Sequence, residues 1–182
     1  GSDIGEGPLA HAGRNAQEHG VSLSLRLAPG LDAVRPEECD TVSIAGMGGQ
    51  TIAEILQAAP WTADGAHLLL LQPMTMVYEL RQWLWAHGYA IERETLCRED
   101  RRRYVVLSVR GGAPAKQVPL PQCAFSPALL CTSGAADYLQ HLLTREQRAL
   151  TGMEQARDRD DTRLAAQRAL VQEIKQALEG LT

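Results

Sequence analysis

The first 110 residues alternate between short apolar segments typical of strands and longer amphipathic segments typical of helices. The strand-like segments comprise residues 21–27, 41–45 and 68–71, and the helix-like segments comprise residues 8–20, 49–60 and 77–88. Two more strand patterns, residues 89–96 and 103–109, are joined only by a charged loop, which predicts an antiparallel hairpin. The order predicts an α/β fold with a doubly wound sheet that ends in this hairpin.

Two of these segments carry specific expectations. Apolar and polar residues alternate from Val21 to Leu27, which predicts a strand over the whole segment. Leu68–Leu71 is a continuous apolar run, which is typical of a strand buried on both faces of a parallel sheet. The following Gln72-Pro73 is expected to end that strand.

The C-terminal part has a different texture. Residues 111–127 are rich in Gly, Pro and Gln and show no periodicity, which indicates a linker. Two apolar stripes then follow at helical spacing: Leu139, Leu142, Leu143, Leu150 and Met153, and Leu164, Val171, Ile174, Leu178 and Leu181. The charged residues 157–163 between them suit the turn of an antiparallel helical hairpin. We therefore divide the chain into a domain at residues 1–112, a linker at residues 113–137 and a coiled-coil-like helical tail at residues 138–182.

Composition excludes several classes of protein. The 182 residues are 45% hydrophobic and carry a formal net charge of −4, which is typical of an ordinary globular chain and not of a disordered one. The longest apolar run, Leu68–Leu71, is far below the roughly 20 residues of a membrane-spanning helix, so we expect no membrane partner and a cytoplasmic location. The four cysteines are widely spaced without a C-x-x-C pair, which predicts reduced thiols and neither a metal site nor a disulfide framework.

Ligand sites in an open α/β sheet lie beyond the carboxyl ends of the strands. Asp3 stands before a helix, where its carboxylate can accept both hydroxyls of a ribose or can cap the helix. Residues 46–49, Gly-Met-Gly-Gly, allow either close approach of a ligand to the backbone or a tight strand-to-helix turn. They are not a dinucleotide fingerprint, because the third glycine would fall at Thr51, and no Gly-Lys-Ser/Thr follows to make a P-loop.

Two polar features leave alternatives open. Gln72, after the third strand, can offer amide hydrogen bonds to a base edge or can simply mark the end of the strand. The cluster of Arg98, Arg101, Arg102 and Arg103 is diluted by acidic neighbours and suits either a solvated hairpin tip or a phosphate contact.

Several motifs together resemble the bacterial tRNA adenine(22)-N1-methyltransferase family. The matching segments are Ser2-Asp3-Ile4-Gly5-Glu6-Gly7-Pro8-Leu9, Ile44-Ala45-Gly46-Met47-Gly48-Gly49, Leu71-Gln72-Pro73, Leu80-Arg81-x-Trp83-Leu84 and Phe125-Ser126-Pro127. The resemblance covers nearly the whole chain and is specific in combination. It implies a class I, Rossmann-like S-adenosylmethionine-dependent methyltransferase with a helical tail.

The resemblance also implies roles for individual residues. The cofactor site would comprise Asp3 at the ribose hydroxyls with Ile4 beside it, Gly30 and Leu31 at the adenine, and Gly46, Met47 and Gly48 at the methionine end. The tRNA would be held by the hairpin and the tail through Arg101, Arg102, Arg103, Arg145 and Arg148. In the reaction, adenine N1 attacks the sulfonium methyl group, so the target base must be unpaired or flipped. Gln72 is the candidate catalytic residue, which would orient that base.

The chain departs from the family pattern in two ways. Pro29 stands where the family has an acidic residue, so one contact to the cofactor's adenine is lost. The first motif, a strand with its Gly- and Asp-containing loop and a helix, would precede Ser2, so we expect an N-terminally truncated fold. Because that strand lies at the centre of the family's sheet, we expect residues 21–27 to be separated from the rest, Thr41–Ala45 to form an edge, and cofactor binding to be weak or absent.

Two other functions remain open from the sequence. The chain could be a class I methyltransferase with another acceptor, because cofactor loops do not define the acceptor. It could also be a non-catalytic interaction module in which the helical tail forms a homodimer.

Overall fold

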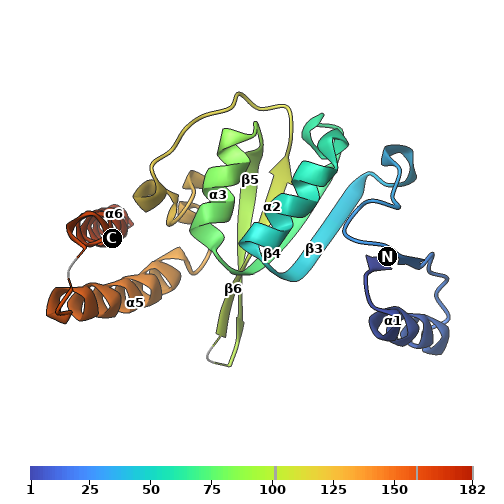
Figure 1. Ribbon diagram of the computed structural model, residues 1–182, viewed down its shortest axis with the longest axis horizontal. Coiled ribbons are helices and arrows are strands. Elements are labelled where there is room, and N and C mark those ends of the chain that lie inside the picture. Colours follow the sequence, from blue (N-terminus) through green and yellow to red (C-terminus); the bar gives the residue numbers. More distant parts are fainter. Residues whose placement is uncertain (101, 159, 182) are drawn as a thin grey trace.

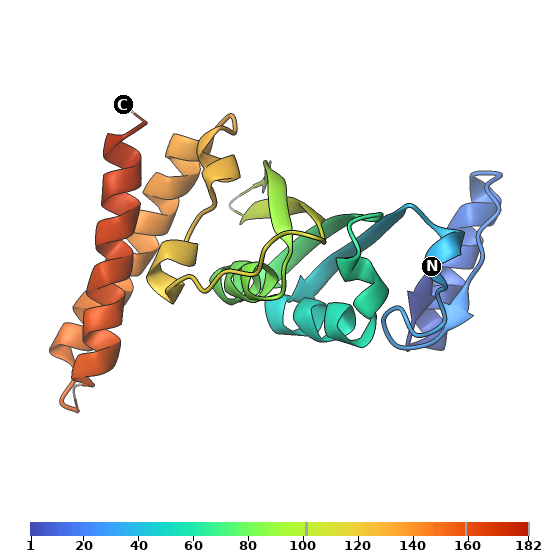
Figure 2. The same ribbon diagram turned by 90° about the horizontal axis from the view of Figure 1, so that it is seen from above.

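The computed structural model describes residues 1–100, 102–158 and 160–181. The molecule is elongated: a four-stranded sheet with two helices occupies the middle, a pair of long helices lies at one end, and a small sheet with one helix lies at the other (Figures 1 and 2). No helix in the described ranges combines the length and the apolar character needed to cross a membrane.

The small sheet contains β1 (Ser2–Asp3) and β2 (Arg26–Leu27), which pair in parallel and are connected through α1 (Glu6–Glu18). The predicted strand over residues 21–27 is therefore wrong except at its last two residues. The partner strand offers only two residues for pairing, so the preceding residues lack a ladder, and Val21 and Leu23 remain exposed. Alternating hydrophobicity indicates a surface for packing but does not provide the neighbouring strand.

The main sheet has the strand order β3-β4-β6-β5. Its strands are β3 (Thr41–Gly48), β4 (Leu68–Thr75), β5 (Ala90–Glu99) and β6 (Arg102–Arg110). The β3–β4 pair is parallel, whereas β4–β6 and β5–β6 are antiparallel, which confirms the α/β class and the predicted terminal hairpin. The division of the strands into two sheets, with β3 at an edge, agrees with the expectation from the sequence.

Strand β4 differs from its prediction in two respects. It continues through Gln72-Pro73 to Thr75, because β6 pairs with β4 only as far as Leu71 and the missing N–H of Pro73 breaks no hydrogen bond to β6. The strand is also covered on one face only. Leu69 and Leu71 are fully buried, whereas Leu68 and Leu70 are half-buried.

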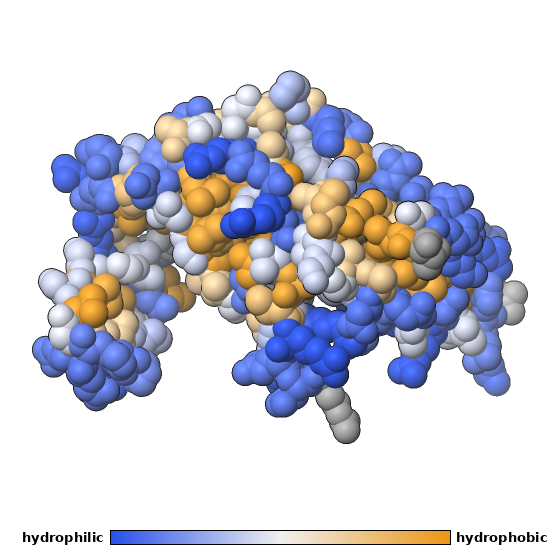
Figure 3. All heavy atoms as spheres, turned by 180° about the vertical axis from the view of Figure 1, so that it is seen from behind, coloured by the Kyte–Doolittle hydropathy of each residue, from blue (hydrophilic) through white to orange (hydrophobic). Residues whose placement is uncertain are grey.

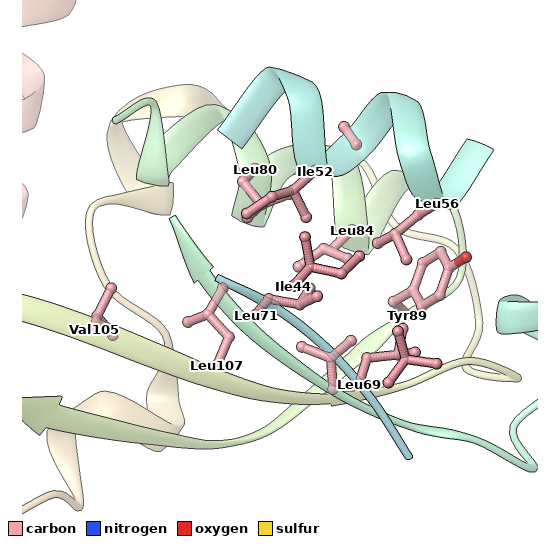
Figure 4. Packing of buried hydrophobic residues seen from close by; sticks show 13 residues of the cluster. Ile44, Ile52, Leu56, Leu69, Leu71, Leu80, Leu84, Tyr89, Val105 and Leu107 are labelled. Atoms are coloured by element: carbon pink, nitrogen blue, oxygen red, sulfur yellow. The ribbon is translucent and has the colours of Figure 1, made fainter. Parts of the chain in front are cut away.

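Helices α2 (Gly49–Ala58) and α3 (Val77–Ala86) cover one face of this sheet (Figure 1). Their apolar residues recur at helical spacing and pack onto the inward residues of the strands (Figure 4). The fully buried members of this core are Ile52, Leu56, Leu69, Leu71, Leu80, Leu84, Leu107 and Val109. Short 3-10 turns complete this part of the chain at Pro36–Glu38 and Pro60–Ala63.

The predicted linker wraps around the sheet and is anchored by a buried ion pair. It contains a 3-10 turn, Leu120–Cys123, and the short helix α4 (Pro127–Leu130). Arg81 of α3 pairs with Glu94 of β5 at 2.7 Å, with both side chains fully buried, and also donates to the carbonyl oxygens of Cys123 and Ala124. The linker thereby satisfies the rest of the guanidinium group.

The C-terminal helices α5 (Ala135–Gln155) and α6 (Asp161–Glu179) lie side by side and run in opposite directions (Figure 2). Both predicted stripes supply buried residues to their shared core, among them Leu139, Leu142, Val171 and Ile174. The turn begins after Gln155, within one or two residues of the predicted charged stretch.

Candidate functional site

The end of β3 forms a turn whose backbone is open to a ligand. Gly46 has a φ of 77°, in the left-handed region that favours glycine, and a Cβ added there would meet no atom within 4 Å. The neighbouring Met47 is 37% exposed. The Gly46 N–H donates to Oε1 of Gln72 on β4, at 2.9 Å. The amide of Gln72 therefore fixes the turn and joins the carboxyl ends of the two strands.

The two glycines that follow hold this end of the sheet close to the start of α3. A Cβ on Gly49 would lie 2.3 Å from the carbonyl oxygen of Met76, so no other residue fits without a backbone shift. A Cβ on Gly48 would lie 3.2 Å from Oγ1 of Thr75. The Gly-Gly pair thus allows the first turn of α2 to approach the β4–α3 connection.

A second group of predicted cofactor residues lies on the small sheet. Oδ1 of Asp3 accepts a hydrogen bond from the Gly5 N–H at 2.7 Å, and Gly5 is the N-cap of α1. The alternative in which Asp3 itself caps the helix is therefore not realised. Ile4 is 78% exposed, so its side chain contributes little to packing within this chain.

The loop after β2 connects this group to the main body. Gly30 has a φ of 50°, and a Cβ added there would lie 3.0 Å from the side chain of Ile55 on α2. Leu31 packs against the main core. The Ser2 hydroxyl donates to the Gly30 carbonyl oxygen, which ties β1 to the same loop.

The predicted cofactor residues therefore fall into two groups, a carboxylate with a glycine loop on one sheet and an open glycine turn on the other. A carboxylate such as Asp3 can accept hydrogen bonds from ribose hydroxyls, and the open backbone at Gly46 admits a ligand closely. The group around Asp3 is chemically suited to the nucleoside of an adenosyl cofactor, and the turn at Gly46 is suited to its methionine end.

A first pocket, of about 230 Å³, lies where β4 leads into α3. Its lining residues come from the β4–α3 connection and from α5: Met74, Thr75, Met76, Val77, Tyr78, Glu79, Tyr138 and Arg145. The hydroxyl of Tyr78 donates to Glu146 at 3.1 Å and accepts from Arg145 at 2.6 Å. Burial is the main cause that raises the pKa of Tyr78 far above its usual range, so this hydroxyl stays protonated.

A second pocket, of about 270 Å³, adjoins the first and shares Met74, Val77, Tyr138 and Arg145 with it. It lies between the hairpin and α5, and its other lining residues are Pro73, Arg102, Arg103, Tyr104, Val105, His141 and Leu142. Figure 3 shows from behind that hydrophilic residues cover the projecting hairpin.

The structure brings together three of the five predicted RNA-binding arginines. Arg102, Arg103 and Arg145 line the second pocket. Arg148 is exposed on the same helix as Arg145 but does not line either pocket, and Arg101 lies outside the described residues.

Sequence reasoning missed the aromatic and imidazole groups of these pockets. Tyr78, Tyr138 and His141 stand at helix positions where the pattern indicates only packing or solvent. The spacing of Tyr138, His141 and Arg145 along one helix face, at intervals of three and four residues, is the signal that could have indicated a shared surface.

Comparison with known proteins places this geometry in a family. The profile of the methyltransferase domain family matches residues 1–107. The tRNA (adenine(22)-N(1))-methyltransferase of Bacillus subtilis (strain 168) is 36% identical over 112 residues, which cover 60% of this chain and 47% of that protein. The chain thus spans about half the length of the curated relative it matches.

Solved structures agree along nearly the whole chain. A protein of the NADB-Rossmann superfamily from Streptococcus agalactiae superposes with a TM-score of 0.79 at 30% identity, covering 98% of this chain and 78% of its own. A Streptococcus pneumoniae protein solved in complex with S-adenosyl-L-methionine gives a TM-score of 0.78 at 27% identity, covering 97% and 79%. These matches confirm the Rossmann-like α/β fold, and the chain belongs to the methyltransferase domain family.

Proposed function

We propose that this chain carries out S-adenosylmethionine-dependent methylation of adenine N1 in tRNA. The support from relatives is the sequence similarity to a tRNA (adenine(22)-N(1))-methyltransferase and the structural similarity to a protein solved with S-adenosyl-L-methionine. The observation that carries the proposal is the hydrogen bond between Gly46 and Gln72, because it joins the open turn of β3 to the strand that leads into the first pocket. A methyl donor bound at the turn would therefore lie beside an acceptor base bound in the first pocket. A tRNA substrate also implies a cytoplasmic location.

In this proposal the cofactor contacts both groups of candidate residues. Asp3 accepts hydrogen bonds from the ribose hydroxyls, Gly30 and Leu31 lie at the adenine, and the turn at Gly46 and Met47 holds the methionine end. Bound S-adenosylmethionine supplies a methyl group on a positively charged sulfur. The side chains of this chain orient the two reactants and exclude water from between them.

The acceptor base occupies the first pocket. Adenine N1 lies on the Watson–Crick edge, so the base must leave its helix or be unpaired before it can react. Its lone pair lies in the ring plane and would form the new bond to the methyl carbon, which bound S-adenosylmethionine would supply with a neutral thioether as its leaving group. Tyr78 and Tyr138 offer aromatic surface to the base, and no proton must be removed before attack.

Gln72 can act on this reaction in two ways. Its Oε1 holds the Gly46 N–H, while its Nε2 lies 3.3 Å from both the Pro73 carbonyl oxygen and the Met74 sulfur. Orientation of the base requires Nε2 to exchange one of these partners for the base edge. Gln72→Ala should then lower kcat on tRNA, whereas a residue that only fixes the turn should mainly raise the KM for the cofactor. An unchanged kcat would remove the base-orienting role of Gln72 and leave only its role at the turn.

The proposal is tested by incubating the chain with an unmodified tRNA transcript and S-adenosylmethionine at high concentration. Nucleosides from the digested RNA are then separated by chromatography and identified by mass spectrometry, and 1-methyladenosine is expected. The matched control is a transcript with guanine at the methylated position, because guanine N1 carries a proton and has no free lone pair in the plane. Methyl transfer to another acceptor would overturn the tRNA assignment and support a different substrate.

Light scattering on the same purified protein tests whether the helical tail forms a dimer. If the chain transfers no methyl group to any acceptor but forms a stable dimer by light scattering, the interaction-module alternative replaces the enzyme. Removal of residues 138–182 would then abolish the dimer.

A further inference from the structure

We propose that the second pocket, between the β5–β6 hairpin and α5, binds a backbone phosphate of the RNA, with Arg103, Arg145 and His141 as its contacts. This inference rests on the proposed function, because it names how the same site holds its substrate. It goes further by selecting a defined anion site among the arginines and by adding a histidine that takes up a proton when the anion binds.

The position of the pocket favours a phosphate. It shares four lining residues with the first pocket, so ligands in the two pockets are within the reach of one nucleotide. Each pocket is somewhat smaller than the roughly 300–1,000 Å³ of ordinary ligand sites, which suits one part of a nucleotide in each. The first carries one arginine and one carboxylate, Arg145 and Glu79, beside its methionines and tyrosines, whereas the second adds Arg102, Arg103 and His141 to Arg145 and has no carboxylate among its lining residues in the described part of the chain. A base therefore belongs in the first and its phosphate in the second.

The charges at the second pocket leave a positive excess. Arg103 pairs with Asp137 at 3.1 Å and Arg145 pairs with Glu146 at 2.6 Å. Arg102 has no ion pair within the described part of the chain. Glu99 lies nearby, where it accepts from the Tyr104 hydroxyl at 3.2 Å, but the charged residues that line the pocket itself are all cationic in the part of the chain that is described. The carboxylates also hold the arginines in place, which lowers the entropy lost when an anion binds.

Glu146 is itself anchored from the neighbouring helix. Nε2 of Gln167 on α6 donates to Oε2 of Glu146 at 2.9 Å and to its carbonyl oxygen at 3.0 Å. The Arg145 side chain lies over the ring of Tyr78, 5.7 Å from its centre, and remains more than half exposed. The guanidinium group of Arg145 is thus held through Nε and Nη2 by Glu146 and Tyr78 and remains accessible from solvent, as an anion contact requires.

His141 gives the site a proton link. Arg103 donates to Nδ1 of His141 at 3.3 Å, which requires an unprotonated nitrogen there. Burial, and then the charges of Arg103 and Arg145, lower the pKa of His141, while Asp137 raises it. The other titratable groups that line this pocket are Arg102, Tyr104 and Tyr138. A phosphate beside these groups offsets the cationic charge, so His141 is protonated on binding and donates to the phosphate.

The test measures the affinity of the full chain for an unmodified tRNA transcript, without cofactor, by fluorescence anisotropy over a range of salt concentrations. Arg103→Gln and Arg145→Gln should each weaken binding roughly ten-fold and reduce the slope of log affinity against log salt by about 1. Arg163→Gln is the matched control, because Arg163 is exposed on α6 and lies outside both pockets. It should change affinity by less than about two-fold.

His141→Gln supplies a readout that folding alone does not change. Affinity of the unsubstituted chain should rise as pH falls from about 8 to about 6, and this rise should vanish in His141→Gln, with affinity at pH 8 unchanged. The pocket would be overturned if all three arginine variants lost RNA affinity equally and His141→Gln kept the pH dependence of the unsubstituted chain. Such a result indicates diffuse electrostatic attraction between the RNA and the protein surface. Absence of RNA binding would overturn it as well.

The outcome separates this inference from the proposed function. Pocket-dependent RNA binding without 1-methyladenosine formation would support the phosphate site and reject the methylation assignment. If Arg103→Gln, Arg145→Gln and His141→Gln leave tRNA methylation unchanged, the methylation assignment is supported and the phosphate site is rejected.

Discussion

Replacement of Arg81 by Met is expected to lower the free energy of unfolding by roughly 3–5 kcal/mol. Arg81 and Glu94 are both fully buried, and two parallel hydrogen bonds of 2.9 and 2.7 Å join them. Arg81 also donates to the carbonyl oxygens of Cys123 and Ala124, at 3.1 and 2.8 Å. Methionine fills a similar length but leaves a carboxylate and two carbonyl groups buried without donors. The loss is a large part of the stability of an ordinary domain.

Urea unfolding followed by tryptophan fluorescence measures this loss, because Trp83 and Trp85 lie on the same helix as Arg81. The melting temperature should fall by roughly 6–20 °C for a chain of this size. The control is Arg168→Met, which removes an exposed ion pair with Glu154 at 2.9 Å and should change stability by less than about 1 kcal/mol.

A double variant separates a buried charge from a lost contact. Arg81→Met combined with Glu94→Leu removes both charges, and apolar replacement of a buried pair is often close to neutral, so much of the loss should be recovered. Two results would refute the reasoning: a single variant no less stable than Arg168→Met, or a double variant in which the separate losses of its two substitutions simply add.

Three further outcomes follow from the structure. The Pro36 carbonyl and Asp64 raise the pKa of His67. The contribution of His67 to stability is therefore complete below about pH 6.5 and is lost as pH rises through the raised pKa. Urea unfolding across this range should show that the difference in free energy of unfolding between the unsubstituted chain and His67→Gln shrinks at high pH. Ser126→Ala removes the cap that accepts from the Leu129 N–H at 3.2 Å, and thermal unfolding should reveal a loss of about 1 kcal/mol. Calorimetric titration of S-adenosylmethionine should give an affinity weaker than micromolar, because its candidate contacts lie on two sheets that, within the described residues, share no hydrogen-bonded strand pair; micromolar binding would contradict this.

The sequence predicted the elements of the main sheet well because each has its own local signal. Helical spacing in α2 and α3 and the paired patterns of the hairpin depend on residues close in the chain. The failures depend on distant partners. Residues 21–25 have a strand pattern but pair with no strand in the described part of the chain, and β4 passes through Pro73 because β6 pairs with β4 only as far as Leu71. Periodicity does not contain information about either neighbour.

The candidate site shows the same division. The open turn at Gly46 could be expected from its glycines, since a strand that ends in such residues admits a close ligand. The pocket residues could not, because Tyr78 and Tyr138 are about 60 positions apart and meet only when α5 packs beside α3. Arg148 shows a further limit of the sequence: it has the charge of Arg145 and lies three residues on along nearly the same side of α5, but it falls beyond the residues that line the pockets.

The helical tail forms part of the site, although the sequence divides it from the sheet. Both pockets are walled by Tyr138 and Arg145 of α5, and the second also by His141 and Leu142. Their remaining lining residues come from the sheet, the β4–α3 connection and the first turn of α3. The hydrogen bonds that Tyr78 accepts from Arg145 and donates to Glu146 cross that boundary, and Gln167 extends the network to α6. A change in how the helix pair packs would therefore move a wall shared by both pockets. Under the proposed function, the tail is a structural requirement for the geometry of the acceptor site and not only an additional surface for RNA.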